Sequence, residues 1–423
     1  MKGRLVAVKR MLPQYFELAS QEVSLLQQSD DHPNVIRYFC QQNDQNFLYI
    51  AVELCRASIW DLYQGEDTSS RERAALLVDI NCDAPRALAQ IAAGLCHLHD
   101  LRIVHRDIKP QNILIAYPKK NDTTGPRFVI SDFGLCKTLP DNASTLIGTT
   151  GNAGTVGWKA PELIHIPANL DGKPNSSMAS HSRESSSSSE SGAAGTGVKR
   201  AVDIFSLGCV FFFVLTGGCH PFDDSEGWIQ LRELNVKKGK ANFSPLQNLG
   251  DDAEEPMHLI SQMLAHRPEC RPSARQVLQH PFFWSLERRL AFLCDVSDHW
   301  EREVRDPPSA ALETLESFAG NVLGPRGDFM LVLDRKFVES LGKQRKYFGH
   351  RLLDLLRALR NKRNHYDELP HEVQLRVGVV PDGYLRYWTT RFPKLLMACY
   401  SAVQACGLEG ETRFRPYFVN SIR

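Results

Sequence analysis

The chain has 423 residues, 43% of them hydrophobic, and its 50 lysine and arginine residues nearly balance 49 aspartate and glutamate residues. This length and apolar content predict two or three globular domains, and a net charge of +1 excludes nucleic-acid binding driven by overall charge. Any contact with a polyanion therefore has to come from local basic patches, such as residues 343–346 and 357–363.

Cysteine usage and hydropathy indicate the kind of cellular compartment in which the chain is expected. The 11 cysteines include no Cys-x-x-Cys pair, which argues against a zinc site or a redox dithiol, and their odd number argues against a complete disulfide set. The chain has no run of about 18 uncharged apolar residues, and its N-terminal MKGRLVAVKR is typical of a strand followed by charge, not of a secretory signal. We therefore expect a soluble chain in a reducing compartment.

The first elements in chain order are a strand and a helix that carry a lysine and a glutamate. The sequence VAVK alternates over residues 6–9 and predicts a strand that includes Ala7 and Lys9. Glu22 lies in a following run with helical spacing. A lysine on a strand, paired with a glutamate on the next helix, is suited to contact the α- and β-phosphates of a nucleotide.

Three further motifs follow in a fixed order, HRDIKPQN at 105–112, DFG at 132–134 and APE at 160–162. Together with VAVK and Glu22 they resemble the protein kinase family, whose fold is bilobal and of the α+β class. The resemblance implies that ATP or ADP and Mg²⁺ are the cofactors. In it, Asp107 orients the substrate hydroxyl and Lys109 steadies the γ-phosphate, while Asn112 and Asp132 hold magnesium.

The same resemblance assigns less conspicuous positions. Val52 takes the gatekeeper place, so Glu53 and Cys55 belong to the hinge whose backbone groups bind adenine. Asp203 and Arg271 match structural positions in the C-terminal lobe. Phosphorylation candidates lie between DFG and APE, where phosphate can order the loop through a basic partner, and they are Ser144, Thr145, Thr149 and Thr150.

One departure from the kinase pattern concerns the N-terminus. Kinases cover ATP with a glycine-rich loop upstream of the lysine, and only eight residues precede Lys9 here. The loop and the first two strands are therefore absent from this chain, which predicts an unprotected sheet edge and a fragment of a longer protein.

A change of composition marks an insert in the kinase region. Residues 168–199 are rich in Ser, Gly, Asn and Ala and contain little apolar matter, so we expect a disordered segment before a helix that starts near Val202. The kinase domain is then assigned to residues 1–283, and a second, all-α domain to residues 284–423. The helices predicted in this second domain cover 298–304, 310–315, 328–341, a leucine-striped segment after 351, and 393–406.

The leucine-striped helix carries polar groups at both ends. Tyr347 precedes it, and Arg360 and Asn361 come at its C-terminal end with His365 one turn beyond. A phenol, an imidazole, a guanidinium and an amide are the groups that metal-free RNA cleavage requires, because the 2′-hydroxyl loses a proton, the 5′-oxygen gains one and charge builds on the phosphate. On spacing alone, a solvated basic helix end or a surface that binds RNA without cutting it fits equally.

This segment resembles the C-terminal ribonuclease domain shared by ribonuclease L and the inositol-requiring kinase-endoribonucleases of the unfolded protein response, of which the chain looks like a fungal type. The HPFFWSLE phrase at 280–287 extends the resemblance across nearly the whole chain. The family motif of Tyr, Arg-Asn-Lys and His falls here on Tyr347, residues 360–362 and His365. It implies Tyr347 as general base, His365 as general acid, and Arg360 and Asn361 on the scissile phosphate.

The expectation is therefore a Ser/Thr kinase fused to an endoribonuclease that cleaves RNA stem-loops, but not DNA, without a cofactor. The resemblance further implies a homodimer or higher oligomer on the cytoplasmic face of the endoplasmic reticulum, with membrane attachment only through upstream segments. Two alternatives remain open: a kinase with a non-catalytic helical scaffolding tail, and a ribonuclease L-like protein whose kinase senses nucleotide. The presence of Lys9, Asp107 and Asp132 argues against the last of these.

Overall fold

The computed structural model describes residues 5–44, 46–65, 71–118, 125–139, 154–164, 192–224, 227–341 and 346–419, with the backbone alone for 192–199. It divides into two compact units, one of Met1–Leu246 with Ile260–Leu278 and one of Gln247–Leu259 with Gln279–Arg423. Residues 247–259 and 279–283, which the sequence placed in the kinase domain, thus cluster with the second unit. All 11 cysteines are free.

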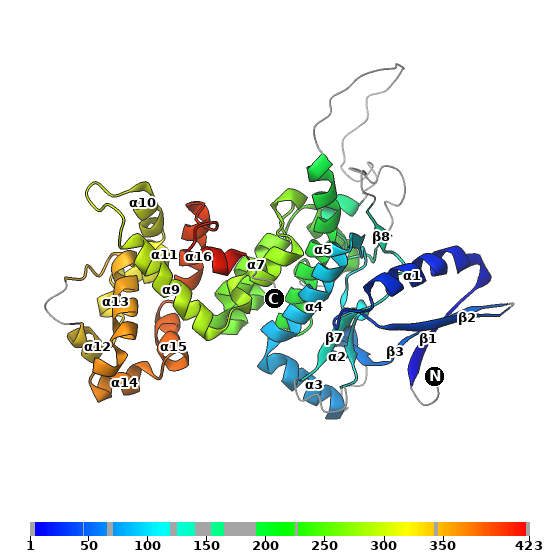
Figure 1. Cartoon of the computed structure of the whole chain (residues 1–423), viewed down its shortest axis with the longest axis horizontal. Helices are drawn as coiled ribbons and strands as arrows, with labels where there is room; N and C mark the ends of the chain where they lie inside the picture. Colours follow the sequence, from blue (N-terminus) through cyan, green and yellow to red (C-terminus); the bar gives the residue numbers. More distant parts are fainter. Residues whose placement is uncertain are drawn as a thin grey trace, which may run out of the picture. The chain divides into compact units, whose positions relative to one another are not determined.

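The N-terminal part of the first unit is a small sheet with one helix on it (Figure 1). The sheet is antiparallel, in the order β1-β3-β2, and the helix is α1. The bounds are β1 (Val6–Met11), α1 (Phe16–Ser29), β2 (Tyr38–Asn43) and β3 (Leu48–Glu53). Helix α1 buries one apolar stripe, which includes Val23 and Leu26, and this orientation also buries Glu22. Strand β1 is an edge strand among the described residues, with Val8 56% exposed.

The rest of the first unit is mostly helical, with two further small antiparallel sheets, β4-β6-β7 and β5-β8. Helices α4 and α5 pack against each other, and α5 is buried around its whole circumference from Ala201 to Val214. Helix α5 begins at Gly192, ten residues before the predicted start, so residues 192–199 of the predicted insert have a helical backbone. The strands and helices are β4 (Cys55–Ser58), α2 (Ile59–Gln64), α3 (Arg71–Cys82), α4 (Ala84–Asp100), β5 (Ile103–Val104), η2 (Pro110–Asn112), β6 (Ile113–Ala116), β7 (Arg127–Ile130), β8 (Lys137–Thr138), η3 (Pro161–Leu163), α5 (Gly192–Leu215), α6 (Ile229–Lys237), η6 (Pro268–Cys270) and α8 (Ala274–Gln279).

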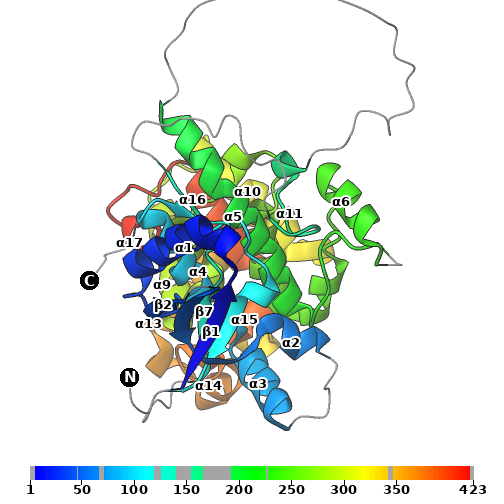
Figure 2. The same ribbon diagram turned by 90° about the vertical axis from the view of Figure 1, so that its right-hand side faces the viewer.

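The second unit is all-helical in its described residues, as predicted, and α13 packs against α9 in its core (Figures 1 and 2). The five leucines of the predicted stripe are buried, and Leu355 and Leu359 are completely enclosed. The elements are η5 (Ser244–Ala253) and α7 (Glu254–Met263), which cross between the units, η7 (Pro281–Phe283), α9 (Leu286–Trp300), α10 (Ala310–Ser317), α11 (Ala319–Leu323), η8 (Gly324–Arg326), η9 (Phe329–Leu331), α12 (Arg335–Ser340), α13 (Leu352–Asn364), η10 (Tyr366–Glu368), α14 (His371–Val377), α15 (Asp382–Arg391), α16 (Leu395–Ala405) and α17 (Arg415–Phe418).

Two helix predictions in this unit were wrong in their bounds. The predicted helix 298–304 is the end of α9, which stops at Trp300. The predicted helix 328–341 is split, because Asp328 caps η9 and Asp334 caps α12, each with its carboxylate accepting a backbone N–H. No helix in the described ranges is both long enough and apolar enough to span a lipid bilayer.

Candidate active sites

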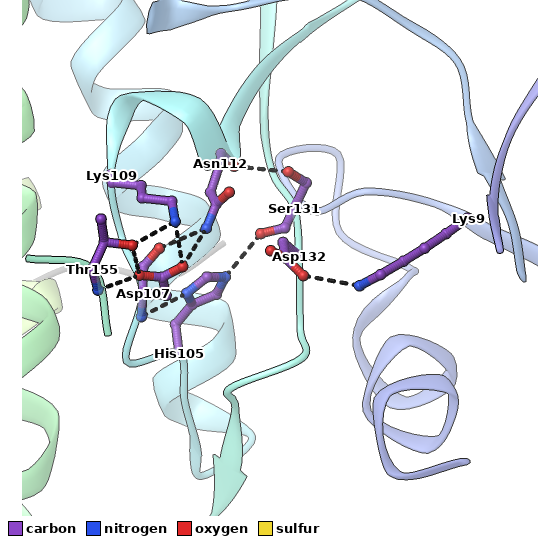
Figure 3. Close-up of polar contacts among 8 residues, drawn as sticks. All are labelled: Lys9, His105, Asp107, Lys109, Asn112, Ser131, Asp132 and Thr155. Atoms are coloured by element: carbon purple, nitrogen blue, oxygen red, sulfur yellow. Dashed lines mark hydrogen bonds and ion pairs between the residues drawn. The ribbon is translucent and has the colours of Figure 1, made fainter. Parts of the chain in front are cut away.

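The first site begins at the lysine of β1. The Lys9 ammonium lies 2.8 Å from Glu22 Oε1 on α1 and 3.0 Å from Asp132 Oδ1, the aspartate of the DFG motif (Figure 3). Burial alone would lower the pKa of Lys9, but the two carboxylates outweigh it and raise that pKa above its ordinary value. Burial alone would raise the pKa of Asp132, but the contact with Lys9 outweighs burial and lowers that pKa. Both groups are therefore held charged, and the predicted ion pair of Lys9 with Glu22 is present.

A second cluster surrounds Asp107 (Figure 3). Lys109 Nζ donates to Asp107 Oδ2 at 2.7 Å, and Asn112 Nδ2 donates to the same oxygen at 3.0 Å. Thr155 donates to Asp107 Oδ1 twice, from its backbone N–H at 2.9 Å and from its hydroxyl at 2.7 Å. Sequence reasoning missed Thr155, although its place five residues before the APE motif was a usable signal. The Asp107 carboxylate is thus fixed from three sides.

The backbone around these residues is held by a buried aspartate. Asp203 on α5 accepts the N–H groups of His105 and Arg106 at 2.8 and 2.7 Å, and it also contacts His99 Nε2 at 3.0 Å. Arg106 and Asp132 both adopt positive φ, 70° and 63°, which costs of the order of 1–3 kcal/mol for a residue with a side chain. The hydrogen bonds that Asp203 accepts stabilise the strained backbone at Arg106.

The other predicted structural residue closes the activation segment onto the C-terminal lobe. Arg271 is buried and forms a two-pronged ion pair with Glu162 of the APE motif, at 2.7 and 2.9 Å. Its guanidinium also donates to three backbone carbonyls. The predicted phosphorylation candidates Ser144, Thr145, Thr149 and Thr150 lie outside the described residues.

The predicted hinge lies between two sheets. Glu53 is the last residue of β3 and Cys55 the first of β4, so the single residue between them joins the N-terminal sheet to the β4-β6-β7 sheet. Ala7 faces Val52 in the register of β1 and β3. The Glu53 carboxylate is paired with Arg127, and the Glu53 backbone N–H donates to the carbonyl of Arg37 at 2.9 Å. Burial, reinforced by Glu53, raises the pKa of the Cys55 thiol to about 12, so this cysteine is a poor nucleophile.

The residues predicted to hold magnesium fit a hard cation. Asn112 uses its amide N–H group on Asp107, so its Oδ1 is the atom left to serve as a ligand, and Asp132 supplies a charged carboxylate. Within the described ranges, no cluster of three or more His, Cys, Asp or Glu side chains is arranged to bind a metal. A site with two protein ligands suits Mg²⁺, which completes its shell with water and nucleotide phosphate.

The second site is built on α13 of the second unit. Asn361 Nδ2 donates to the phenol oxygen of Tyr347 at 3.0 Å, and Arg360 donates to Asn361 Oδ1 at 3.2 Å. Arg360 is also paired with Asp298 on α9 at 2.6 Å. The structure thus brings three of the four predicted residues into one hydrogen-bonded chain. Asp298 is a partner that sequence reasoning did not identify, because it comes from another helix.

A buried carboxylate in the first turn of α13 holds the residues around Tyr347. Asp354 is 3% exposed; it accepts the N–H of Phe348 at 2.8 Å and an N–H of Arg357 at 2.6 Å. The Arg357 guanidinium lies 5.5 Å from the centroid of the Tyr347 ring and is also paired with Glu301. Arg357, not Arg360, is therefore the cation over the phenol ring, and neither Asp354 nor Arg357 was predicted. Their spacing of three residues on one helix was the available signal.

The fourth predicted residue caps α13 at its C-terminus. His365 Nδ1 lies 2.9 Å from Glu368 Oε1, and the His365 side chain is 58% exposed. A carboxylate at Nδ1 favours the tautomer with its proton there, which leaves Nε2 to exchange a proton with a ligand. Lys362 points elsewhere and donates to the backbone carbonyl of Ser340; burial lowers its pKa. Of the basic patch at 343–346, only Lys346 is among the described residues.

The fold and the first site define a protein kinase: a lysine-glutamate pair, a catalytic-loop aspartate and a DFG aspartate meet between a small sheet and a helical lobe. The second unit adds a helical domain with an acid-base site of its own.

Comparison with known proteins agrees with both parts. The protein kinase domain family matches residues 1–182 and 189–283, and the family described as ribonuclease 2-5A matches residues 289–418. The chain therefore belongs to the protein kinase family, with a ribonuclease 2-5A domain at its C-terminal side. The predicted resemblance to kinase-endoribonucleases is confirmed.

Three of the similar curated proteins carry both activities in their names. The serine/threonine-protein kinase/endoribonuclease IRE1 of Hypocrea jecorina is 50% identical over 98% of this chain and 33% of its own length. The serine/threonine-protein kinase/endoribonuclease ireA of Aspergillus fumigatus is 48% identical over 98% of this chain and 37% of its own. The human serine/threonine-protein kinase/endoribonuclease IRE2 is 42% identical over 99% of this chain and 40% of its own length. The chain thus spans between a third and two fifths of these relatives.

Proposed function

We propose that the chain is a bifunctional enzyme, a Ser/Thr kinase that phosphorylates its own activation segment and an endoribonuclease that cleaves stem-loop RNA without a metal ion. The observation that carries the second activity is the 3.0 Å contact between Asn361 and the Tyr347 hydroxyl, which joins two separate parts of the predicted RNA-cleaving motif. The relatives named as kinase/endoribonucleases support both activities.

In the kinase reaction, Asp107 accepts a hydrogen bond from the attacking Ser or Thr hydroxyl and orients it. Lys109, held at 2.7 Å from Asp107, places its charge where the transferred phosphoryl group passes. Lys9 contacts the α- and β-phosphates of bound ATP, while Asn112 and Asp132 hold Mg²⁺. The bound metal neutralises negative charge on the phosphates. Ala7 and the hinge from Glu53 to Cys55 enclose the adenine.

In the ribonuclease reaction, the 2′-oxygen of the substrate attacks the adjacent phosphorus and the bond from phosphorus to the 5′-oxygen breaks. Tyr347 takes the proton from the 2′-hydroxyl, and His365 gives a proton to the leaving 5′-oxygen. Arg360 and Asn361 stabilise the negative charge that builds on the phosphate. The products are a 2′,3′-cyclic phosphate and a 5′-hydroxyl. DNA lacks the attacking hydroxyl and is not cut.

The biological setting follows from the relatives. The Schizosaccharomyces pombe relative, 42% identical over 98% of this chain, is named a sensor for unfolded proteins in the ER. We infer that this chain acts in the unfolded protein response, in mRNA splicing at the cytoplasmic face of the endoplasmic reticulum, as a homodimer or higher oligomer.

The test is cleavage of an end-labelled RNA stem-loop with excess EDTA, comparing wild type with His365→Ala and, as a matched control, with His371→Ala, an exposed histidine of α14. We expect wild type and the control to cut in EDTA and leave a cyclic phosphate, and His365→Ala to lose the activity by a factor of about 10²–10⁴. No cleavage by wild type, at concentrations where autophosphorylation is confirmed, would leave a kinase with a scaffolding tail and overturn the ribonuclease proposal.

A further inference from the structure

The residue after Tyr347 has no role in the proposed reaction, yet its side chain is placed beside the site. Phe348 is 37% exposed, although large aromatic side chains are usually buried. Its backbone is fixed on both sides: its N–H donates to Asp354 at 2.8 Å, and its carbonyl accepts the N–H of Arg351 at 3.0 Å. The position of the ring is thus set by the same carboxylate that supports Tyr347.

Two cations lie on this ring. Lys346 Nζ is 5.1 Å and Arg351 Cζ 4.8 Å from the centroid of Phe348. Within the described part of the chain, neither cation has a carboxylate partner.

Two of the nearby carboxylates are engaged with other groups. Asp354 is paired with Arg357, and Glu316 accepts the backbone N–H groups of Leu352 and Leu353 at 2.8 and 3.1 Å. The ring therefore carries two cations that form no ion pair among the described residues, and it lies beside the proposed general base.

We propose that Phe348 is a stacking platform for an unpaired RNA base next to the cleaved bond, with Lys346 and Arg351 contacting the flanking phosphates. This rests on the proposed ribonuclease function. An exposed aromatic ring with adjacent cations is how proteins bind single-stranded RNA, because every base has a π-face and every nucleotide a phosphate. A loop nucleotide held by its base on Phe348 would present its neighbour's 2′-hydroxyl to Tyr347.

A second copy of the chain is the competing occupant of this surface. Lysine is depleted at the cores of protein interfaces, whereas an aromatic ring between two unpaired cations matches the charge of a polyanion. The observations therefore favour RNA, and contact with another copy becomes an outcome of the test.

The test measures binding of the 423-residue chain to a fluorescent stem-loop RNA with a 2′-deoxy nucleotide at the cleaved position, which prevents cutting. Phe348→Leu keeps apolar volume but removes the ring, and we expect it to weaken binding by about 5- to 150-fold. Phe348→Trp should bind within about twofold of wild type, since it keeps a stacking face. The matched control is Leu375→Ala, an exposed apolar residue of α14, which should bind as wild type.

An abasic nucleotide scanned through the loop then identifies the stacked base. At one position, the abasic RNA should bind the wild-type chain more weakly by the same factor by which Phe348→Leu weakens binding of the intact RNA. The Phe348→Leu variant should bind this abasic RNA and the intact RNA equally well. Replacing both Lys346 and Arg351 by Gln should reduce the slope of log affinity against log salt by about 0.7 for each phosphate that these cations neutralise. Thermal unfolding of each variant checks that the fold is intact.

Three results would overturn the inference. Wild-type cleavage with no abasic position coupled to Phe348 would remove the stacking platform and leave the ribonuclease intact. A change in self-association by Phe348→Leu, measured by sedimentation velocity at unchanged RNA affinity, would assign the surface to a second copy. Failure of wild type to bind the RNA would remove both this inference and the ribonuclease proposal.

Discussion

At the scale of single residues, the kinase site depends on hydroxyl and carboxylate groups that hold one another before substrate binds. The Thr155 hydroxyl donates to Asp107 at 2.7 Å and accepts from Lys109 at 2.5 Å, so one small side chain sets the spacing of two catalytic groups. The ribonuclease site has the same property, because Asn361 fixes Tyr347 and is itself fixed by Arg360. In both sites, a neutral side chain therefore organises the catalytic groups in advance.

The first prediction concerns Thr155. Replacing it by Val keeps the shape of the side chain but removes the hydroxyl that connects Asp107 and Lys109, while Thr155→Ser keeps it. Because a hydrogen bond to a charged group contributes about 1.5–3 kcal/mol, we expect Thr155→Val to slow autophosphorylation roughly 10- to 100-fold and Thr155→Ser to act nearly as wild type. Incorporation of labelled phosphate measures this. Equal rates for Val and wild type would show that the hydroxyl has no such role.

At the scale of elements, α13 is the helix on which the proposed ribonuclease site is built, and its N-terminus is held by another helix. Glu316 on α10 accepts the N–H groups of Leu352 and Leu353, which replaces the cap that Arg351 does not supply. A carboxylate at a helix N-terminus is also favoured by the helix dipole. The position of Asn361 therefore depends on a side chain from a separate helix.

The second prediction is that Glu316→Ala lowers the free energy of unfolding of the second unit by about 1–2 kcal/mol, because two helix N–H groups lose their acceptor. RNA cleavage should fall with it, because α13 carries Arg360 and Asn361. Urea unfolding followed by tryptophan fluorescence measures the stability. Glu313→Ala, in the first turn of the same helix, is the control and should lower stability only by the helix-dipole contribution of about 0.3–1 kcal/mol. An equal loss in the control would refute the capping role.

A second element contact is sensitive to pH. His280 accepts the N–H of Phe282 at its Nδ1, so its Nε2 carries a proton and donates to His258 Nδ1 at 2.9 Å. Both rings pack against Tyr400, and Glu255 and Arg289 pair close by. Burial lowers the pKa of both histidines below the ordinary 6.5, strongly so for His280. This junction between η7 and α7 is thus built from two neutral imidazoles.

The third prediction follows from the sign of these shifts. Well above pH 6.5 both histidines are neutral in the folded and unfolded chains, and their contribution to stability is complete. As pH falls below about 6.5, the unfolded chain binds protons that the folded chain does not, and stability drops by up to about 1.4 kcal/mol per pH unit for each histidine. His258→Gln, which keeps an acceptor for His280, should show a shallower loss between about pH 7.5 and 5.5 in urea unfolding. His371→Gln is the control; a slope unchanged by His258→Gln would contradict the assignment.

At the scale of the whole molecule, each proposed activity is contained in one compact unit. The residues around Asp107 and Asp132 belong to the first unit, and Tyr347, Asn361 and His365 belong to the second. The second unit also includes Gln247–Leu259, a segment that the sequence placed in the kinase domain. Two chemistries can therefore be separated by mutation even though their chain segments are interleaved.

The fourth prediction is this separation. Asp107→Asn should reduce autophosphorylation by about 10²-fold or more, because the hydroxyl of the substrate loses its charged acceptor, and should leave the affinity for uncleavable stem-loop RNA within about twofold. His365→Ala should do the reverse, abolishing RNA cleavage while autophosphorylation stays at the wild-type rate. Loss of autophosphorylation in His365→Ala would show that the two sites depend on each other.

The sequence by itself determined which chemical groups are present and in what order along the chain, because short motifs such as HRDIKPQN and DFG place their residues within one loop. It also determined α13, since five leucines at helical spacing specify a buried stripe whatever surrounds it. The pair of Lys9 and Glu22 was predictable from the kinase pattern, which places the lysine on a strand and the glutamate on the next helix.

The tertiary structure alone decided which groups from distant segments meet. Thr155 on Asp107, Asp298 on Arg360 and Glu316 on α13 join segments 48, 62 and 36 residues apart. A side chain's partner across that separation depends on how helices pack, which local spacing does not encode. The exposure of Phe348 likewise depends on the tertiary structure. So does the lack of an ion pair, in the ranges that the structure describes, for Lys346 and Arg351, the two cations on its ring.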